Sequence, residues 1–515
     1  MIFGQRLGII ICDNKYRINT LMTYAFSMLS LSRVNSTTAI FSLFFNLGLF
    51  LTLISIGDYN SDYYVGSAYA RPQVFLDGPI LNDPNLVVQK VYHGLKSPTA
   101  MAFLAPDDIL VLEKGQGTVQ RIINGEMLPE PLLQVDVNSK DERGLLGIAI
   151  ASKAEEEGEK RADTTMITAE RNTEAGFSSP TSTYVFLFFT EAAQSKGDTP
   201  AGNRVYKYEL VDNNTKLANP TLLLDLPATP DDSHVGGALQ IGPDNHLYFT
   251  VGDQRPTAFS RTDFPDSQTK AQNYINGIEP DGRAGILRIT QDGEVVGGKE
   301  GIFGDEHPLN KYYAYGVKNS FGFDFDPVTE NLWDTENGPT FGDEINLVEP
   351  GFNSGWASIQ GFWTLNDKHK KVEEVNPPSP SINAEEDDYG LVDFGGKGKY
   401  SSPEFVWDVA PTALAFLNSD RLGQQYENDI FVGDTKYGNL YHFKLDEQRT
   451  GLLLDGALED RVGSIEELKQ QAVFGHGFGV ITDIEVGPDG YLYILTFGKE
   501  GTLYRIVPVA NSEIK

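Results

Sequence analysis

Short apolar stretches alternate with polar or glycine-containing turns along most of the chain after residue 88. Long apolar patterns with a helical period are scarce, whereas glycine and proline are frequent, with 52 and 27 residues among 515. Runs such as "TYVFLFFT" (183–190) have the length and the aromatic and β-branched content of strands. The pattern therefore predicts an all-β fold made of many short strands joined by tight turns.

One hairpin pattern recurs six times along the chain. Each copy has a turn rich in Asp, Asn, Pro or Gly, an apolar strand, a glycine-containing turn and a second strand. The copies lie at 105–122, 182–210, 242–289, 326–348, 427–445 and 487–506. Their spacing, roughly 60 to 85 residues, leaves room for two more strands and a loop in each unit. We expect a six-bladed β-propeller with four-stranded antiparallel blades, whose radial closure protects the sheet edges; a β-sandwich with irregular insertions is the alternative.

The first seventy residues have a different character. No charged residue lies between Val34 and Gly57, and this stretch is long enough to cross a bilayer, with Arg33 as its positive flank. The small-residue pattern at 68–70 resembles a signal cleavage site, so a cleaved signal and a retained membrane anchor both stay open. We expect a leader at 1–70 and one catalytic domain at 71–515 that is extracytoplasmic.

Charge and cysteine content narrow the function classes. The only cysteine, Cys12, lies in the leader, so disulfides and thiol chemistry are excluded from the exported part. The net charge of −31 repels nucleic acid and suits calcium, neutral substrates or a salty exterior. Two polar insertions are expected near 152–181 and 364–402; the core of the second, 366–390, reads as a loop between blades, where a substrate lid would fit.

Three motifs contain residues suited to chemistry. In "SHVGG", His234 is a candidate general base, because Gly236 and Gly237 let the backbone turn tightly and a flat ligand approach; a strand-capping histidine is the alternative. In "ENGPTFGDEINL" (336–347), backbone carbonyls at the Gly-Pro turn and nearby carboxylates provide the oxygen ligands that calcium prefers, although a solvated hairpin turn would look the same. A lysine and an amide in "GVKNS", and a lysine in "GDTKYG", would suit an anionic ligand, or simply lie in turns.

Taken in order, these motifs resemble the glucose/sorbosone dehydrogenase family, the soluble aldose dehydrogenases that use pyrroloquinoline quinone (PQQ). The similarity runs from about Val88 to Val507 and includes "ERGLLGIAI", "HVGGALQIGPDNHLYFTVGDQ", "YGVKNSFGFDFDP" and "ENGPTFGDEINLVEPGFNSGWASIQG". The family fold is a six-bladed propeller, in agreement with the repeat count.

The resemblance also implies roles for individual residues. His234 takes the position of the base that removes the proton from the anomeric hydroxyl, and Glu142 takes a position on the substrate side. The positions implied for the cofactors are Lys318, Asn319, Lys436 and Thr482 for PQQ, Gly338 and Pro339 for the calcium ion of the cofactor, and Glu344 for a second, structural calcium ion.

Two of these positions depart from the family pattern. Relatives carry arginine where this chain has Lys318 and Thr482, so one planar guanidinium fork and one cation are lost. The resemblance implies an exported, calcium-containing PQQ-dependent dehydrogenase for an aldose sugar or polyol, with an external electron acceptor. A PQQ-free propeller that acts as a binding module and a calcium-dependent lactonase-type hydrolase are the alternatives.

Overall fold

The computed structural model describes residues 78–154, 181–194, 199–229, 231–254, 268–366, 370–374 and 389–509. All of them belong to the compact unit formed by residues 65–515. The predicted leader and most of the predicted insertion at 152–181 lie outside the described residues. No helix in the described ranges has both the length and the apolar character needed to span a membrane.

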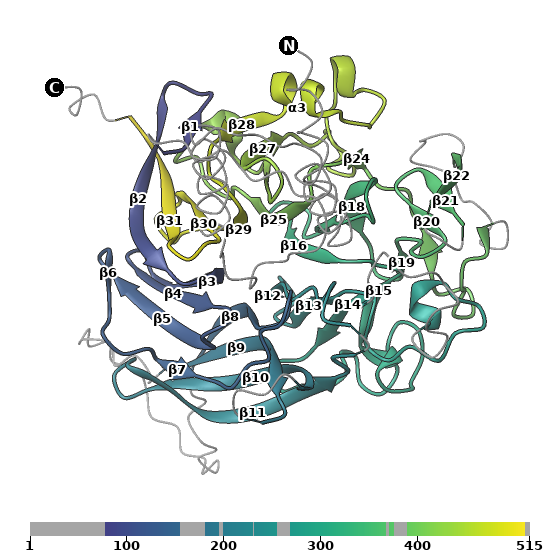
Figure 1. The fold of residues 1–515 in the computed structure, drawn as a ribbon, viewed down its shortest axis with the longest axis horizontal. Coiled ribbons are helices and arrows are strands. Elements are labelled where there is room, and N and C mark those ends of the chain that lie inside the picture. Colours follow the sequence, from purple (N-terminus) through teal and green to yellow (C-terminus); the bar gives the residue numbers. More distant parts are fainter. Residues whose placement is uncertain are drawn as a thin grey trace, which may run out of the picture. The chain divides into compact units, whose positions relative to one another are not determined.

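Strands dominate the described chain and confirm the all-β prediction. They form six sheets of four to six strands and a smaller sheet of three. Each of the six has an inner strand, and we number the sheets by these strands: β3 (Pro98–Ala105), β8 (Leu145–Ala154), β12 (Leu239–Ile241), β16 (Ser320–Phe325), β25 (Pro411–Phe416) and β29 (Ile481–Val486). The inner strands lie nearest the middle of Figure 1.

The other strands extend each sheet outward. Sheet 1 also contains β4 (Asp108–Glu113), β5 (Thr118–Ile123), β6 (Glu126–Met127) and β7 (Leu133–Gln134). Sheet 2 also contains β9 (Thr181–Ala192), β10 (Pro200–Val211) and β11 (Lys216–Leu226). Sheet 3 also contains β13 (Leu247–Val251), β14 (Gly285–Ile289), β15 (Tyr312–Tyr315), β19 (Phe352–Asn353) and β23 (Lys399–Tyr400). Sheet 4 also contains β17 (Leu332–Glu336), β18 (Asp343–Val348) and β24 (Phe405–Trp407). Sheet 5 also contains β26 (Ile430–Asp434), β27 (Asn439–Phe443), β28 (Val473–His476) and β1 (Ile80–Leu81). Sheet 6 also contains β30 (Leu492–Thr496), β31 (Gly501–Pro508) and β2 (Leu86–Leu95). The small sheet and the helices are β20 (Ile359–Gln360), β21 (Trp363–Leu365) and β22 (Lys371–Glu374); α3 (Ile465–Gln471), η2 (Lys270–Gln272), η3 (Leu309–Lys311), η5 (Gln424–Tyr426) and η6 (Gly456–Leu458).

Successive sheets contact one another in chain order. Strand β3 contacts β8, β8 contacts β12, β13 contacts β16, β16 contacts β25, β25 contacts β29, and β29 returns to β3. A buried apolar cluster fills each of these six junctions. Sheet 6 joins the two ends of the described chain, because Leu86 in β2 is paired with Pro508 in β31. Figure 1 shows the sheets following one another around a common centre.

Strand β9 shows how the sequence pattern suits this packing. Successive side chains of a strand point to opposite faces of the sheet. Phe186 and Phe188 therefore pack against sheet 3, while Val185, Leu187 and Phe189 pack against sheet 1. Because both faces of the strand are covered, its apolar run is continuous rather than alternating.

The six repeated hairpins are confirmed, since each forms the second and third strands of a different sheet. The pairs are β4–β5, β9–β10, β13–β14, β17–β18, β26–β27 and β30–β31. The loop expected at 366–390 needs a correction, because residues 371–374 form strand β22 on the edge of β21. That edge exists only in the folded chain, so the local sequence pattern did not reveal the strand.

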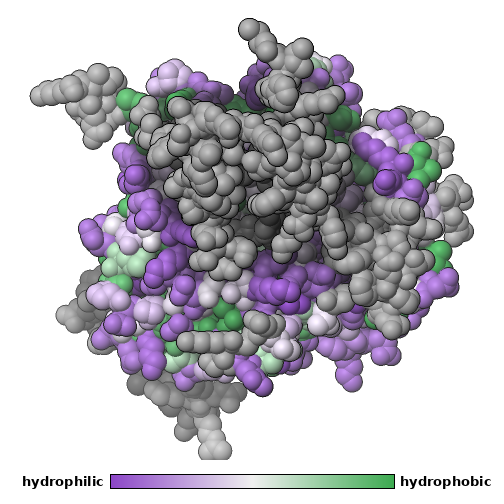
Figure 2. All heavy atoms as spheres, in the orientation of Figure 1, coloured by the Kyte–Doolittle hydropathy of each residue, from purple (hydrophilic) through white to green (hydrophobic). Residues whose placement is uncertain are grey.

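Partly buried carboxylates link neighbouring inner strands. Asp324 Oδ2 in β16 accepts a hydrogen bond from Phe416 N in β25 at 2.8 Å, and Asp483 Oδ2 in β29 accepts one from Met101 N in β3 at 2.7 Å. Burial raises the pKa of Asp324 to about 6 and that of Asp483 to about 7. On the face shown in Figure 2, hydrophilic side chains cover much of the described surface.

These carboxyl groups predict how stability depends on pH. Burial raises the pKa values of Asp324, Asp434 and Asp483 to about 6, 7 and 7, from 3.8 in an unperturbed chain. At pH values between the unfolded pKa and the raised folded pKa, the folded state therefore binds more protons than the unfolded state. The free energy of unfolding should fall as pH rises through this range. We expect a loss on the order of 1–2 kcal/mol per group between about pH 5.5 and 7.5.

Urea unfolding in EDTA, followed by tryptophan fluorescence, measures this dependence. Asp434→Asn removes one titrating group and should flatten the curve. Stability that increases over this pH window would contradict the prediction.

Candidate active site

His234 lies in the turn that leads into β12. Its φ of 54° is in the left-handed region, where a residue with a Cβ atom is strained. The backbone N–H of His234 donates to Glu142 Oε2 at 2.7 Å, and its carbonyl accepts from Gln254 N at 3.2 Å. Strain on the order of 1–3 kcal/mol, held in place by such bonds, is typical of functional sites.

The imidazole of His234 lies between the carboxylate of Asp253 and the side-chain nitrogen of Lys318. Its Nδ1 is 2.6 Å from Asp253 Oδ1, and its Nε2 is 3.3 Å from Lys318 Nζ. Because Nδ1 faces a carboxylate, we assign the ring hydrogen to Nδ1 and the lone pair to Nε2. Asp253 is itself held by Trp356, whose Nε1 donates to Oδ2 at 2.7 Å. We call Asp253, His234 and Lys318 the catalytic line.

Both ends of the catalytic line are buried. Asp253 is 1% exposed and Lys318 2% exposed. Burial alone would raise the pKa of Asp253, but electrostatic interactions with His234 and Lys318 and the hydrogen bonds with His234 and Trp356 hold it below its usual value. Burial lowers the pKa of Lys318, which neighbouring carboxylates only partly offset.

The ammonium of Lys318 lacks a close anionic partner. Within the described ranges, no carboxylate oxygen lies within 4.0 Å of its Nζ atom. A buried ammonium without a paired anion costs several kcal/mol. An anionic or carbonyl group of a ligand would therefore complete this end of the line.

Glu142 and Asn319 form a second contact group beside His234. Asn319 Oδ1 accepts from Gly236 N at 3.1 Å, and its Nδ2 donates to Glu142 Oε2 at 3.4 Å. Together with the His234 N–H, this bond fixes one oxygen of the Glu142 carboxylate. Glu142 is a wall residue of a neighbouring cavity, so its second oxygen is available to a hydroxyl donor.

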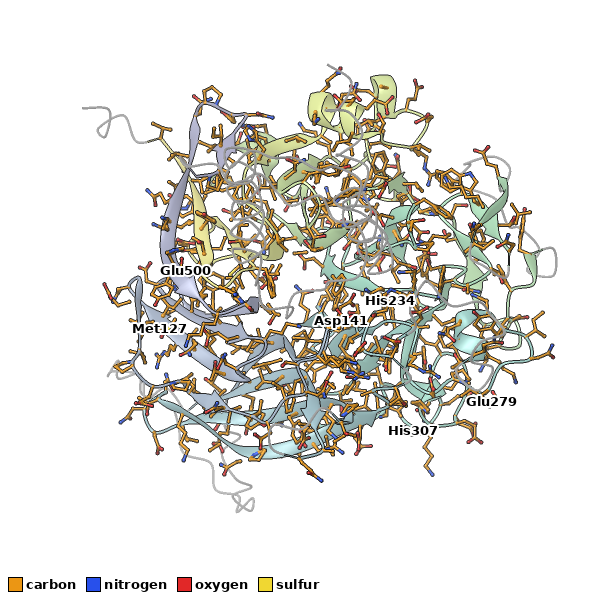
Figure 3. All side chains as sticks on the ribbon, viewed as in Figure 1. Met127, Asp141, His234, Glu279, His307 and Glu500 are labelled. Atoms are coloured by element: carbon orange, nitrogen blue, oxygen red, sulfur yellow. The ribbon has the colours of Figure 1, made fainter. Side chains whose placement is uncertain are left out.

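The cavity has a volume of about 210 Å³ and takes wall residues from all six inner strands. The cavity lies next to the catalytic line, because its wall includes Asp141, Glu142, Gly236 and Gly237. The His234 side chain, which is 11% exposed, is not part of the wall that the described residues define, whereas Glu142 and Gly236 next to it are. Figure 3 shows Asp141 and His234 close together near the middle of the sheets.

The two glycines after His234 are required by close contacts. Gly236 and Gly237 have φ values of 71° and 111°. A Cβ atom on Gly237 would lie 2.6 Å from Leu146 Cβ, and one on Gly236 would lie 2.7 Å from Thr250 O. The expected tight turn is therefore confirmed, and it brings His234 to the cavity side of β12.

The loop of "ENGPTFGDEINL" connects β17 to β18. Gly338 N donates to Asp343 Oδ1 at 2.9 Å, and a Cβ atom on Gly338 would lie only 1.9 Å from Phe341 O. No donor among the described residues is hydrogen-bonded to the carbonyl of Gly338 or Pro339. These two oxygens therefore remain available to a cation.

Glu344 lies in a buried polar cluster behind this loop. Its carboxylate accepts from Gly361 N and Gln360 Nε2 on one oxygen, and from Asn346 Nδ2 and Ser354 Oγ on the other. Burial raises the pKa of Glu344 to about 8. A calcium ion at Glu344 would have to replace some of these donors.

Three other oxygens of this cluster have no hydrogen-bond partner among the described residues. They are Asp334 Oδ2, Asn346 Oδ1 and Gln360 Oε1. In the described part of the chain, no group of three or more His, Cys, Asp or Glu residues is placed to hold a metal ion. A cation here would thus depend on amide and carbonyl oxygens as well as carboxylates.

The two remaining predicted cofactor residues lie apart from the catalytic line. Lys436 Nζ pairs with Asp408 Oδ1 at 2.8 Å, so its charge already has a partner. Thr482 is on the cavity wall, but its hydroxyl lies 3.2 Å from Pro98 O and 3.3 Å from Leu495 O. Neither residue supplies an unpaired cation.

Sequence reasoning missed Asp253, Trp356 and Lys114. Asp253 lies two residues after the end of β13, in "VGDQ". A single acidic residue just after a buried strand is the sequence feature that could have marked it as a site residue. Lys114 donates to the carbonyl of Asp141 on the cavity wall, and burial lowers its pKa. Only the folded chain brings these residues to His234 and Glu142.

Comparison with known proteins gives the family. The model of the family described as Glucose / Sorbosone dehydrogenase matches residues 174–505. The chain belongs to this family. It is 25% identical over 456 residues to aldose sugar dehydrogenase YliI of Escherichia coli, covering 86% of this chain and 98% of that one.

Solved structures agree on the fold of this glucose/sorbosone dehydrogenase family member. The soluble aldose sugar dehydrogenase of Escherichia coli in its apo form has a TM-score of 0.55 at 22% identity, over 82% of this chain and 100% of that one. The PQQ-bound aldose sugar dehydrogenase of Streptomyces coelicolor has a TM-score of 0.51 at 20% identity, over 83% and 99%.

Proposed function

We propose that this chain is a quinoprotein dehydrogenase that oxidises the anomeric hydroxyl of an aldose sugar to the lactone, with PQQ and Ca²⁺. The observation that carries the proposal is the catalytic line beside the cavity, with the Nε2 lone pair of His234 next to an unpaired buried ammonium. Membership of the family and the PQQ-bound relative support the choice of cofactor.

We further propose that the six sheets are the blades of a β-propeller at 71–515, behind a leader at 1–70. The unbroken succession of contacts from sheet 1 to sheet 6 and back supports this architecture. We also propose export to an extracytoplasmic site, with a cleaved signal or an anchor at 34–57, on the basis of the apolar leader.

The residues present fit an anionic or carbonyl edge of PQQ at Lys318. This ammonium has no carboxylate partner within 4.0 Å among the described residues, and one Nδ2 hydrogen of Asn319 remains for a ligand. Fewer unpaired cations are available to PQQ than the family pattern provides, because Lys436 is paired with Asp408 and Thr482 bears no charge. We therefore expect weaker PQQ binding than in relatives that carry arginine where this chain has Lys318 and Thr482.

The residues present also fit Ca²⁺. The carbonyls of Gly338 and Pro339 accept no hydrogen bond from the described residues. Around Glu344, three buried oxygens of neighbouring side chains lack partners. We propose the first pair for the calcium ion of the cofactor and Glu344 for a structural one, in line with the preference of calcium for mixed carbonyl and carboxylate oxygens.

In the reaction, His234 Nε2 takes the proton of the anomeric hydroxyl, and Asp253 keeps the opposite nitrogen protonated and stabilises the imidazolium that results. Lys318 must first move from Nε2 toward the ligand, which frees the lone pair. Glu142 accepts a hydrogen bond from another sugar hydroxyl and so orients the ring. The chemistry that PQQ would supply when held by Lys318 and Asn319 is acceptance of the hydride from the same carbon, with an external acceptor as the final oxidant.

A PQQ-free propeller that binds a ligand is the second candidate function. The observation that favours it is the acidic cavity wall, which carries Asp141, Glu142, Asp324, Asp483 and Glu485 and would repel a tricarboxylate. A lactonase-type hydrolase would need several carboxylates around one central calcium ion, and the described residues contain no such group.

Reconstitution tests the proposed function. The purified domain is loaded with PQQ and Ca²⁺, and the aldose-dependent reduction of an artificial electron acceptor is measured across neutral sugars and polyols. We expect turnover that requires both cofactors. No quinone absorbance on the protein and no turnover with any sugar would leave the binding module as the better description.

A further inference from the structure

The loop at 338–342, which presents the two carbonyls proposed for Ca²⁺, is held from one side by the small sheet. Gln360 Nε2 in β20 donates to Gly342 O at 2.9 Å and to Glu344 Oε1 at 2.8 Å. A Cβ atom on Gly342 would lie 3.3 Å from the Gln360 side chain, so the two segments are in close contact. The small sheet lies outside the six larger sheets and does not complete any of them.

A lysine and two aromatic rings make the second contact between the small sheet and the loop. The rings of Phe341 in the loop and Trp363 in β21 meet edge to face at 5.9 Å. Lys371 in β22 reaches both, with Nζ 3.3 Å from the Trp363 ring centroid and 4.6 Å from that of Phe341. Such cation–π contacts hold side chains in a defined geometry.

The backbone of Gly338 closely approaches that of Phe341. The place of a Cβ atom on Gly338 is 1.9 Å from the Phe341 carbonyl oxygen, so a shift of Phe341 toward the turn would displace the Gly338 backbone. Gly338 is also tied to Asp343, whose second oxygen accepts from Val409 N and Ala410 N. One side of the turn is thus held by the segment between β24 and β25, and the other contacts Phe341.

We infer that Lys371 is a positioning residue for the calcium ion of the cofactor. By holding Phe341 against Trp363, it fixes the turn that presents the carbonyls of Gly338 and Pro339, and thereby raises the affinity of these carbonyls for Ca²⁺. The inference rests on the proposed function, since it requires calcium at this turn. Lys371 touches neither the sugar site nor the catalytic line in the described residues.

The test is a calcium titration of the full chain without PQQ, by isothermal titration calorimetry after EDTA treatment. Lys371→Met removes the charge and keeps the aliphatic stem, whereas Lys371→Arg keeps a cation over the two rings. Lys370→Met is the matched control, because Lys370 is exposed and contacts neither ring in the described structure. Urea unfolding of each variant in EDTA reports on folding alone.

We expect Lys371→Met to weaken calcium binding about three- to tenfold, as for one or two cation–π contacts. Lys371→Arg and Lys370→Met should stay within about twofold of the unsubstituted protein in calcium affinity, with their unfolding midpoints in EDTA unchanged. Equal calcium affinity in Lys371→Met and the unsubstituted protein would overturn the inference and leave the proposed function intact. A protein that binds no calcium before substitution would overturn both.

Discussion

Replacing His234 by alanine is expected to lower kcat for aldose oxidation about 100- to 10,000-fold, because the anomeric proton then has no positioned acceptor. The side chain is nearly buried, and its Nε2 is the ring nitrogen that faces Lys318 rather than Asp253. Binding of PQQ and Ca²⁺ should stay within about twofold, since both are assigned to other residues. Single-turnover kinetics and cofactor absorbance measure the two quantities separately.

A second histidine provides the control. His246 lies in the turn before β13, where its Nδ1 is 2.9 Å from Asp244 Oδ2, and it belongs to the repeated hairpin rather than to the site. His246→Ala should leave kcat unchanged. Full activity in His234→Ala would show that another group removes the proton, and the catalytic line would lose its proposed role.

Replacing Asp253 by asparagine is expected to lower kcat about 100-fold or more while KM for the sugar changes little. Asparagine keeps an acceptor for Trp356 but no longer supplies the negative charge at Nδ1. Without that charge, the imidazolium formed during proton transfer loses its stabilising partner and the ring can adopt the wrong tautomer. Steady-state kinetics of the PQQ-loaded enzyme measure the split between kcat and KM.

The double variant tells a positioning role from a structural one. If Asp253 acts through His234, then His234→Ala combined with Asp253→Asn should be no slower than His234→Ala alone. Losses that multiply in the double variant would mean that Asp253 supports the site by another route. Asp244→Asn, which affects the acid–histidine pair with His246, should leave kcat unchanged.

The fold could be predicted from sequence to the level of hairpins. All six repeated segments are hairpins of six different sheets, because alternation and turn residues are local properties of the chain. Strand β22 was missed for the opposite reason, since its partner edge is supplied by β21. The propeller closure, the leader and export stay predictions.

The site could be predicted only in part. Family resemblance pointed to His234, Lys318 and Asn319, and the folded chain brings these three together with Glu142. Lys436 was expected beside the cofactor but pairs with Asp408. The roles of all these residues remain proposals that the substitutions above test.

The sequence by itself determined the strand pattern, the six hairpins, the acidic charge and the positions of the glycines that the turn at His234 requires. Tertiary structure decided which polar side chains meet. Lys318 lies 84 residues from His234 along the chain, and Trp356 lies 103 residues from Asp253. No local pattern encodes such contacts, because they arise only when buried clusters between successive sheets bring distant turns together. The unpaired charge of Lys318 is likewise a property of burial, which sets the cost of an isolated ammonium.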